Sequence, residues 1–259
     1  PARHGILGPL IRSIFIPEKD HEWGIFDYSQ QEPRLVVHYA SLRHFTGAGK
    51  FVDSYQEDET TDFHTMVSEM ADIPRKQAKT INLGLFYGMG KGKLMSQLGV
   101  NLETASELLA SYNERVPFVK QLMNDTMNKA GKKGYLSTLE GRRCRFDQWE
   151  PTNEWGQKSL PLAEAQQQYG EHMIKRAWTY KALNRLIQGS AADQTKKAML
   201  ALAKEGYLAH IQVHDELDFS VASDADKAKI KDIMENCVEL SVPSKVDVEC
   251  GDNWGDAGD

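Results

Sequence analysis

Cysteine is scarce in this chain, and long hydrophobic runs are missing. The 259 residues include Cys144, Cys237 and Cys250, an odd and scattered set without a Cys-x-x-Cys pair. This usage argues against a disulfide framework and a zinc site, and it suits a reducing compartment. No apolar run approaches the roughly 20 residues of a membrane span, and the N-terminal residues lack the pattern of a signal peptide. We therefore expect a cytoplasmic protein without membrane contacts.

Positive net charge is also lacking. The formal charge is −6 and the isoelectric point about 5.8, which at first argues against a nucleic-acid partner. The charge is unevenly spread, however: residues 115–200 hold 15 Lys and Arg against 8 Asp and Glu, a net of +7 that leaves −13 for the remainder. Because a basic middle with acidic flanks can hold a phosphate backbone, the bulk charge decides little.

An initiator methionine, an internal repeat and a low-complexity linker are absent too. The chain opens on Pro1-Ala-Arg-His, from which we expect a fragment or a processed piece. With 41% hydrophobic and 26% charged residues, the chain has the composition of a globular protein. Its length suffices for one large domain or two small ones with a buried core.

Caps, turn formers and apolar periodicity predict the secondary structure. Strands are predicted over 10–16, 23–28, 208–214, 217–221 and 245–250, with a hairpin over 135–147 that turns at Glu140-Gly141. Helices are predicted over 33–42, 63–71, 74–88, 101–112, 117–132 and 224–240. We expect 46–62 to be a loop, 148–160 to be irregular, and 162–204 to be helical in two segments broken near Gly189.

The stretch 74–90 is the one around which the chain is organised. Pro74 suits the first turn of a helix, and Gly88 and Gly90 offer a stop. Between them one slanted stripe of the helix surface carries two cations, an apolar residue and a phenol: Arg75, Lys79, Leu83 and Tyr87. A polyphosphate could lie on the cations while a flat base meets the far end. The alternative is an ordinary amphipathic helix with a solvated basic end.

Two carboxylate motifs lie far apart in the chain. Asp27 ends a predicted strand just before a helix, and the alternative to a metal ligand is a capping or turn-forming residue. The tip of the later hairpin gathers His214, Asp215 and Glu216, a costly cluster unless a cation neutralises it, although a solvated turn would tolerate it. Nucleotidyl transfer uses two divalent ions, for which two carboxylates and a backbone carbonyl suffice as Mg²⁺ ligands.

Taken in order, four motifs resemble those of the palm and fingers of family A DNA polymerases, phage members in particular. The motifs are DYSQQEPR (27–34), RKQAKTINLGLFYGMG (75–90), NRLIQGSAAD (184–193) and QVHDEL (212–217). The resemblance implies an α+β right-hand fold, an antiparallel palm sheet with helical fingers. It implies palm over 1–45, fingers and return helices over 46–180, and palm again over 181–259. It also implies DNA-templated addition of dNTPs to a primer 3′-hydroxyl, with two Mg²⁺ ions that Mn²⁺ can replace.

The same resemblance implies roles for individual residues. The metal ligands would be Asp27, Asp215 and the backbone carbonyl of Tyr28, with Glu216 in support. Lys79 would also donate a proton to the departing pyrophosphate. The dNTP would be bound by Gln30, Glu32, His64, Arg75, Lys79, Leu83 and Tyr87, of which Glu32 would exclude a ribose 2′-hydroxyl. Primer–template DNA would be contacted by Arg143, Asn184, Gln188 and His214, with Arg34 and Arg142 as structural or DNA-backbone residues.

Departures from the family pattern qualify the resemblance. Leu83 stands where members usually carry an aromatic residue against the nucleotide sugar. No thumb or exonuclease domain precedes the motifs, so we expect a second chain or a missing N-terminal part to supply a thumb. If phage-encoded, the protein would act in phage DNA replication in the bacterial cytoplasm. Two rival functions stay open: a related single-subunit RNA polymerase, against which Glu32 argues, and a non-catalytic DNA-binding subunit, against which the clustered acids argue.

Overall fold

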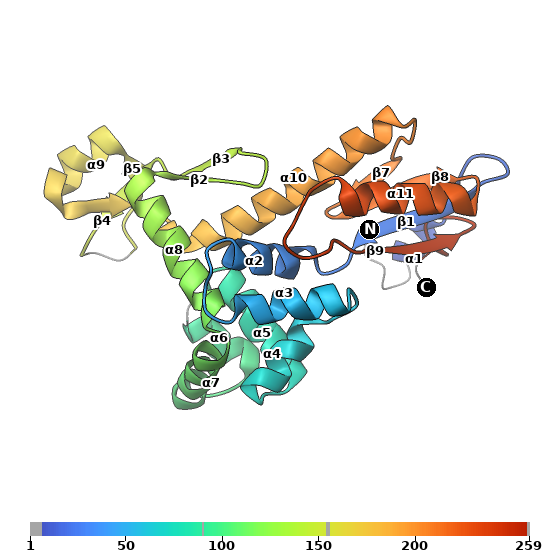
Figure 1. Cartoon of the computed structure of the whole chain (residues 1–259). Coiled ribbons are helices and arrows are strands. Elements are labelled where there is room, and N and C mark those ends of the chain that lie inside the picture. The colour runs from blue at the N-terminus through green and yellow to red at the C-terminus, as the bar shows by residue number, and fades with distance from the viewer. Residues whose placement is uncertain (1–6, 90, 154–155, 258–259) are drawn as a thin grey trace. The chain divides into compact units, whose positions relative to one another are not determined.

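The computed structural model describes residues 7–89, 91–153 and 156–257, and these residues form two compact units (Figure 1). Unit 1 contains the residues up to Arg34, Tyr55–Thr60 and the residues from Ala191 onward. Unit 2 contains Leu35–Ser54 and Thr61–Ser190. Helix and antiparallel sheet both occur, so the α+β prediction is confirmed. Among the described residues, no helix has the length and apolar character needed to cross a membrane.

Unit 1 is built on a four-stranded antiparallel sheet of order β7-β8-β1-β9. Its strands are β1 Glu22–Tyr28, β7 Ile211–Val213, β8 Glu216–Val221 and β9 Val246–Gly251. Around them lie α1 Leu7–Arg12, the beginning of α2 Gln31–Ser41, the end of α3 Ala48–Glu57, the second part of α10 Ala182–Lys204, and α11 Asp224–Asn236. Strand alternation divides the sheet into two buried faces.

Each face of this sheet has its own hydrophobic cluster. Phe26 and Tyr28 point to the face that packs against Leu202 of α10 and Met234 of α11, and Figure 1 shows α11 lying along that sheet. The odd-numbered Trp23 and Ile25 point the other way and pack with Trp254 and Ala257. Because both faces are covered, the four residues of β1 that precede Asp27 are all buried.

Unit 2 is mainly helical and carries two small sheets. Its helices include the rest of α2, α3 and α10, with α4 Phe63–Ala71, α5 Arg75–Phe86, α6 Lys91–Leu98, α7 Leu102–Arg115, α8 Pro117–Lys133 and α9 Leu162–Tyr169. Two 3-10 turns are η1 Glu171–Met173 and η2 Thr179–Lys181. The strands are β2 Tyr135–Ser137 and β3 Arg143–Arg145 in one sheet, and β4 Gln148–Pro151, β5 Leu160–Pro161 and β6 Ile174–Arg176 in the other.

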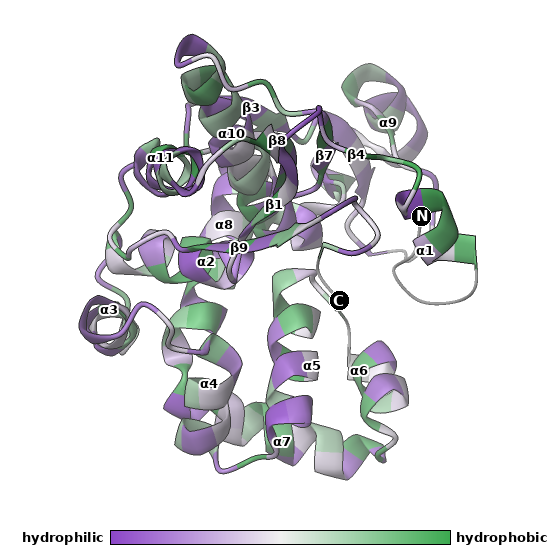
Figure 2. Cartoon of the chain, turned by 90° about the vertical axis from the view of Figure 1, so that its right-hand side faces the viewer, coloured by the Kyte–Doolittle hydropathy of each residue, from purple (hydrophilic) through white to green (hydrophobic). Residues whose placement is uncertain are grey.

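The helix signals in the sequence were accurate where a cap was present. Asp62 caps α4 through the Thr65 N–H at 2.6 Å, and Asn101 caps α7 in the same way. Gly134 ends α8 with φ +78°, in the left-handed region that suits glycine. In Figure 2 the helices of this unit carry both hydrophobic and hydrophilic residues along their length, as amphipathic helices do. The predicted stop at Gly90 lies outside the described residues.

Four sequence predictions of secondary structure were wrong. The predicted strand 10–16 contains the end of helix α1. Both edges of β1 are already paired, with β8 and with β9, so residues 10–16 have no place beside it as a strand. Pro9 is compatible with the helix because it lies in the first turn. The predicted loop 46–62 contains α3, whose buried Ala48, Phe51 and Tyr55 recur at helical spacing among turn-forming residues. The irregular segment 148–160 contains β4 and β5, which form by pairing that local sequence does not reveal.

The predicted two-helix segment 162–204 was the fourth error. Helix α9 ends at Tyr169 with Gly170 as its C-cap, and β6 and two 3-10 turns follow before α10 begins. Gly189 does not break α10. A Cβ at this position would lie 2.8 Å from Thr138 Cγ2, so the glycine allows the β2–β3 hairpin to approach the helix closely. Helix α6 was not predicted.

Substituting Gly134 by alanine tests the close packing behind this fold. The new Cβ would lie 2.6 Å from the Arg176 guanidinium carbon, in a backbone conformation that L-residues disfavour. We expect the free energy of unfolding to fall by about 2–3 kcal/mol, measured by urea denaturation.

Gly141→Ala is the matched control. Gly141 has a similar φ of +80°, but a Cβ added there would meet nothing within 4 Å. We expect this variant to lose only about 1 kcal/mol, the backbone part of the cost. Equal losses for the two variants would contradict a steric contribution from Arg176.

Candidate active site

Three acidic side chains form one row across the sheet of unit 1. Asp27 is the register partner of Glu216 on β8 and of Asp247 on β9. Directly paired residues of antiparallel strands project from the same face, so the three carboxyl groups share a face near the end of β1. Glu216 is buried, Asp27 is half-buried and Asp247 is exposed beside Lys245.

The second carboxylate motif lies at the turn beside this row. Val213 pairs with Glu216, so His214 and Asp215 form a two-residue hairpin turn. His214 has φ +57°, a left-handed conformation that costs a non-glycine residue about 1–2 kcal/mol and is typical of tight turns. The Tyr28 N–H donates to the Asp215 carbonyl at 3.4 Å. The fold therefore brings the ends of the two motifs together, although 188 residues separate Asp27 from Asp215.

The electrostatics of the turn favour a bound cation. Burial raises the pKa of Asp215, and the neighbouring Glu216 carboxylate adds to this effect, whereas a backbone hydrogen bond and His214 oppose it. A carboxylate in such surroundings is stabilised when a cation approaches. In the described part of the chain, no three His, Cys, Asp or Glu side chains converge as a metal-binding group. The carboxylate and backbone oxygens present around this turn are hard donors.

Tyr28 and Arg34 hold the loop that follows Asp27. The Tyr28 hydroxyl donates to the Met234 carbonyl at 2.7 Å inside the core, so its side chain is structural. The buried Arg34 guanidinium donates to three backbone carbonyls, those of Ser29, Pro243 and Glu59, at 2.9, 2.6 and 2.5 Å. It also lies over the Tyr55 ring, 4.5 Å from the centroid. Of the two roles left open for Arg34, the structure supports the structural one.

Gln30 and Glu32 belong to the same loop and the first turn of α2. Gln30 adopts φ +54° and accepts a hydrogen bond from the Tyr55 hydroxyl at 3.3 Å. Glu32 is half-buried in the first helical turn, where a negative charge is favourable. Two non-glycine residues with positive φ, Gln30 and His214, thus lie in the two carboxylate motifs, and such strain is common at functional sites.

The stripe of Arg75, Lys79, Leu83 and Tyr87, here called the cationic stripe, lies on the outer face of α5 in unit 2. Arg75, Lys79 and Tyr87 are exposed and Leu83 is half-buried. The opposite face of the helix is buried through Ala78, Ile81, Asn82 and Phe86. Helix α5 ends at Phe86, and Tyr87 occupies the C-cap before Gly88, which has φ +66°. A Cβ on Gly88 would lie 2.4 Å from the Tyr180 carbonyl oxygen, so only glycine fits beside Tyr87.

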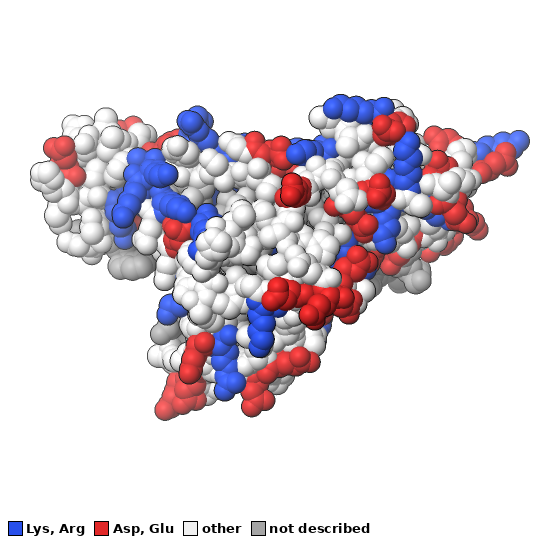
Figure 3. Space-filling view, in the orientation of Figure 1, with Lys and Arg blue, Asp and Glu red and all other residues white. Residues whose placement is uncertain are grey.

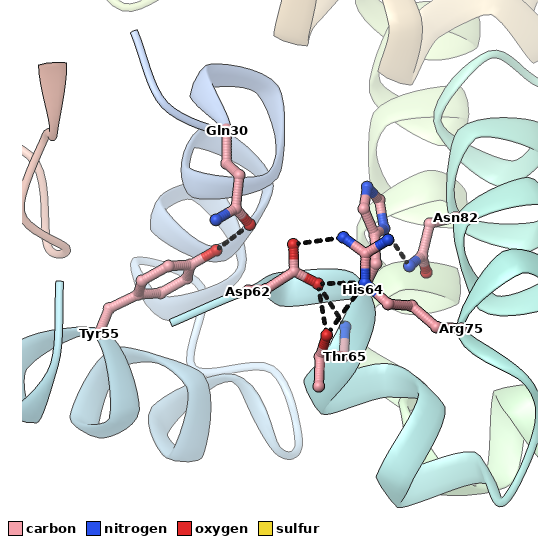
Figure 4. Close-up of polar contacts among 7 residues, drawn as sticks. All are labelled: Gln30, Tyr55, Asp62, His64, Thr65, Arg75 and Asn82. Atoms are coloured by element: carbon pink, nitrogen blue, oxygen red, sulfur yellow. Dashed lines mark hydrogen bonds and ion pairs between the residues drawn. The ribbon is translucent and has the colours of Figure 1, made fainter. Parts of the chain in front are cut away.

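Arg75 is held by Asp62, a residue that the sequence indicated only as a helix cap. Its guanidinium donates to Asp62 Oδ2 at 2.9 Å, to Oδ1 at 3.2 Å and to Thr65 Oγ1 at 3.1 Å (Figure 4). Burial alone would raise the pKa of Asp62, but hydrogen bonds from Arg75 and Thr65 outweigh burial and hold this pKa below its usual value. Asp62 therefore positions the first cation of the stripe.

His64 lies in the first turn of α4, two residues after the N-cap Asp62, and its ring belongs to a group of buried, hydrogen-bonded polar side chains. Asn82 Nδ2 lies 2.8 Å from His64 Nδ1, and the Tyr112 hydroxyl lies 2.6 Å from Asn82 Oδ1. Desolvation lowers the pKa of His64; Asp62 opposes this effect, and Lys79 and Arg75 reinforce it. Asn82 and Tyr112 were missed in the sequence. The available signal was a polar residue on the buried face of an amphipathic helix.

The residues predicted to contact DNA fall in both units. Asn184 is half-buried and Gln188 exposed, one turn apart near the start of α10 in unit 2. The β2–β3 hairpin lies along this part of the helix, where Arg142 donates to the Gly189 carbonyl at 2.7 Å. Arg143 is exposed on β3, with its guanidinium over the Tyr135 ring. His214 is exposed in unit 1.

Basic side chains gather in unit 2 near that hairpin. Figure 3 shows Lys and Arg clustered over the end of α8, whose last turn carries Lys132 and Lys133. Of the predicted residues, unit 1 holds Asp27, Tyr28, Gln30, Glu32, His214, Asp215 and Glu216, and unit 2 holds His64, Arg75, Lys79, Leu83, Tyr87, Arg143, Asn184 and Gln188.

These features define an α+β protein with an acidic sheet edge and a cationic helix, the parts from which nucleotidyl-transfer enzymes are built. The family model of "DNA polymerase family A" matches residues 3–256. The chain belongs to DNA polymerase family A, as its four motifs predicted.

Individual relatives agree with this assignment. The chain is 39% identical to the DNA-directed DNA polymerase of Pseudomonas phage M6, over 94% of this chain and 40% of that protein. It is 34% identical to DNA polymerase I of Bacillus subtilis (strain 168), over 96% of this chain and 28% of that protein. The chain thus spans two-fifths or less of the length of these relatives.

A solved structure resembles the whole chain. The POL domain of Pol1 from M. smegmatis, in complex with DNA primer-template and dNTP, matches with a TM-score of 0.78 and 29% identity. The match covers 100% of this chain and 44% of that chain. The fold of the described residues is therefore that of part of a family A polymerase domain.

Replacing Arg34 by lysine tests the anchor behind Asp27. Lysine keeps the charge but cannot reach three carbonyls in a plane or stack on Tyr55 as a guanidinium does. We expect the free energy of unfolding to fall by about 2–4 kcal/mol in chemical denaturation, because buried acceptors lose their donors. Arg115→Lys is the control, since the exposed Arg115 donates to one carbonyl, that of Met70 at 3.2 Å. A comparable loss in both variants would refute the anchoring role.

Proposed function

We propose that this chain is the catalytic portion of a DNA-templated DNA polymerase, with palm elements over 1–45 and 181–259 and fingers over 46–180. The reaction is attack of a primer 3′-hydroxyl on the α-phosphate of a dNTP, with release of pyrophosphate. The observation that carries the proposal is the adjacency of the two acidic motifs in unit 1, where Tyr28 donates to the Asp215 carbonyl and Asp27 faces Glu216. In a phage, the reaction would serve replication of the phage DNA.

The proposed metal ligands are Asp27, Asp215 and the backbone carbonyl of Tyr28, with Glu216 in support. The donor set fits Mg²⁺, which prefers hard oxygen ligands and keeps several waters, and Mn²⁺ could replace it. Two bound ions would lower the pKa of the attacking hydroxyl and neutralise charge on the triphosphate. Burial of Asp215, which raises its pKa, supports the proposal because a divalent ion would offset the cost of ionising this group.

The proposed dNTP contacts come from α5 and from the loop after β1. Arg75 and Lys79 would bind the triphosphate, and Lys79 would protonate the departing pyrophosphate, whereas His64 would donate to a phosphate oxygen. Leu83 and Tyr87 would meet the sugar and the base pair. Gln30 and Glu32 would line the sugar side, with Glu32 excluding a ribose 2′-hydroxyl.

The proposed DNA contacts are Asn184, Gln188, His214 and Arg143. Minor-groove hydrogen bonds from the first three would check base-pair geometry rather than sequence, and Arg143 would contact the phosphate backbone. The relatives are longer than this chain, and we propose that a second chain or a further N-terminal part supplies a thumb.

Primer extension with Mg²⁺ and dNTPs tests the proposal. We expect Asp27→Asn and Asp215→Asn to lower the extension rate by about a thousandfold or more, because each removes a charged ligand while leaving the sheet folded. Asp232→Asn, on the exposed surface of α11, is the control and should extend at the parent rate. Near-parent extension by both acidic-site variants would refute the metal assignment.

The same assay separates the rival functions. A clear preference for rNTPs over dNTPs would favour an RNA polymerase and contradict the proposed role of Glu32. DNA binding without extension, in the chain alone and with the thumb-bearing part added, would favour a non-catalytic subunit. Extension that vanishes when EDTA removes divalent ions is the result that the proposal requires.

Lys79→Ala tests the cationic stripe. We expect a higher KM for dNTP and a lower kcat, with kcat/KM reduced about 10- to 100-fold, because a contact to the triphosphate strengthens in the transition state. Lys76→Ala is the control: Lys76 is also exposed on α5 but lies outside the stripe. An unchanged kcat/KM for Lys79→Ala, measured in single-nucleotide insertion, would remove the proposed role.

A further inference from the structure

Three polar side chains are linked by hydrogen bonds in the interior of unit 2. His64 of α4, Asn82 of α5 and Tyr112 of α7 are 8%, 0% and 0% exposed. The Tyr112 hydroxyl lies 2.6 Å from Asn82 Oδ1, and Asn82 Nδ2 lies 2.8 Å from His64 Nδ1. Three helices thus meet through two short hydrogen bonds in a buried environment, where donors and acceptors must match.

The hydroxyl proton of Tyr112 decides which group donates and which accepts in each of these two hydrogen bonds. Burial raises the pKa of Tyr112, so the phenol keeps its proton. Among the described residues, Asn82 is the one hydrogen-bond partner of the hydroxyl. A buried O–H donates when an acceptor is available, so the amide presents its oxygen to Tyr112 and its NH₂ group to the histidine.

The imidazole must then accept at one defined nitrogen. An NH₂ group has no lone pair to offer, so His64 Nδ1 accepts the hydrogen bond and carries no proton. In a neutral ring the proton therefore resides on Nε2. Figure 4 shows Asn82 bonded to one ring nitrogen, with the other nitrogen on the far side of the ring. No described residue hydrogen-bonds to Nε2, so this N–H can serve a ligand.

We infer that Asn82 and Tyr112 are positioning residues, which hold His64 as the neutral Nε2–H tautomer so that it donates a hydrogen bond to a phosphate oxygen of the incoming nucleotide. The inference rests on the proposed function for the identity of the ligand. The tautomer itself follows from the hydrogen bonds alone.

The charged groups around His64 are consistent with a neutral ring. Asp62 precedes it on the same segment and favours the protonated form, but Arg75 and Lys79 of α5 disfavour it, and α7 contributes the uncharged Tyr112. Desolvation adds to the cations and lowers the pKa of His64. A neutral N–H donor beside two cations binds an anionic oxygen directionally without adding a third repelling charge.

Histidine-selective ¹⁵N NMR of the full chain at pH 8 tests the tautomer, with His64→Gln used to assign its signals among the 8 histidines. We expect His64 to show a protonated Nε2 and a bare Nδ1. Asn82→Asp offers a carboxylate that accepts from both neighbours, so we expect the proton to move to Nδ1. Tyr112→Phe removes the hydroxyl that orients the amide and should give a mixture of both tautomers.

Tyr39→Phe is the matched control. It also removes a buried tyrosine hydroxyl of unit 2, one that lies 2.7 Å from Ser190 Oγ, but it has no bond to His64. Its His64 signals should match those of the parent protein. A parent ring protonated at Nδ1, or one tautomer unchanged in both Asn82→Asp and Tyr112→Phe, would overturn the inference. Circular dichroism verifies that each variant is folded, and the milder Tyr112→Phe keeps the test decisive if Asn82→Asp unfolds.

Nucleotide kinetics test the consequence for binding. We expect the KM for dNTP to rise about twofold in Tyr112→Phe and about tenfold in Asn82→Asp, as expected for loss of a hydrogen bond to a charged group. Because Asn82→Asp also raises the His64 pKa, its KM should acquire a pH dependence that the parent lacks near pH 7. Altered tautomers with unchanged KM would refute the positioning role. A parent protein that extends no primer would refute the proposed function but leave the NMR result intact.

Discussion

Antiparallel pairing of β1 with strands on both of its edges is the constraint on which the acidic site depends. Strand β1, Glu22–Tyr28, pairs with β8 of the β7–β8 hairpin along one edge and with the late strand β9 along the other. Phe26 and Tyr28 pack against α10 and α11 on one face of the sheet, and Trp23 and Ile25 pack on Trp254 on the other. A shift of the register by one residue would turn Asp27 into the hydrophobic core, so the two buried faces and the position of the carboxylate are specified together.

The acidic side chains near the end of β1 lower the stability of the sheet there, and neighbouring contacts offset this loss. Arg34 satisfies three carbonyls of the loops around Asp27, and Tyr28 ties the strand end to α11. Gln30 and His214 adopt left-handed backbone conformations in the same region. Strain of this kind persists only where the surroundings over-determine the backbone, and here hydrogen bonds and core packing supply that rigidity. A rigid rim of this kind suits the cation binding proposed for it.

Helix α5 exposes one face to solvent and buries the other in unit 2. The exposed face carries Arg75 and Lys79, and Asp62 fixes the arginine. The buried face carries Asn82, whose amide joins α4 to α7 through directional hydrogen bonds rather than through apolar contact alone. A buried amide is costly unless both ends are satisfied, so the pair His64 and Tyr112 explains why this position is polar.

The sequence by itself determined the local features with strong chemical signatures. Asp62, Asn101 and Gly134 marked helix ends, and Glu140-Gly141 marked a hairpin, because caps and turns depend on neighbouring residues. The four ordered motifs likewise predicted the family. Strands β4–β6 were missed because they form by pairing with distant residues, as Trp149 does with Arg176. Helix α3 was missed because turn-forming residues obscured the helical spacing of its buried side chains.

Only the tertiary structure decided which side chains meet. Asp27 and Asp215 are 188 residues apart, and no local pattern places the Tyr28 N–H beside the Asp215 carbonyl. The same holds for Arg34, which the sequence left open between two roles, and for the bonds from Asn82 to His64 and Tyr112. Local chemistry acts over a few residues and can be read along the chain, whereas such contacts arise from strand register and helix packing, which the whole chain sets cooperatively.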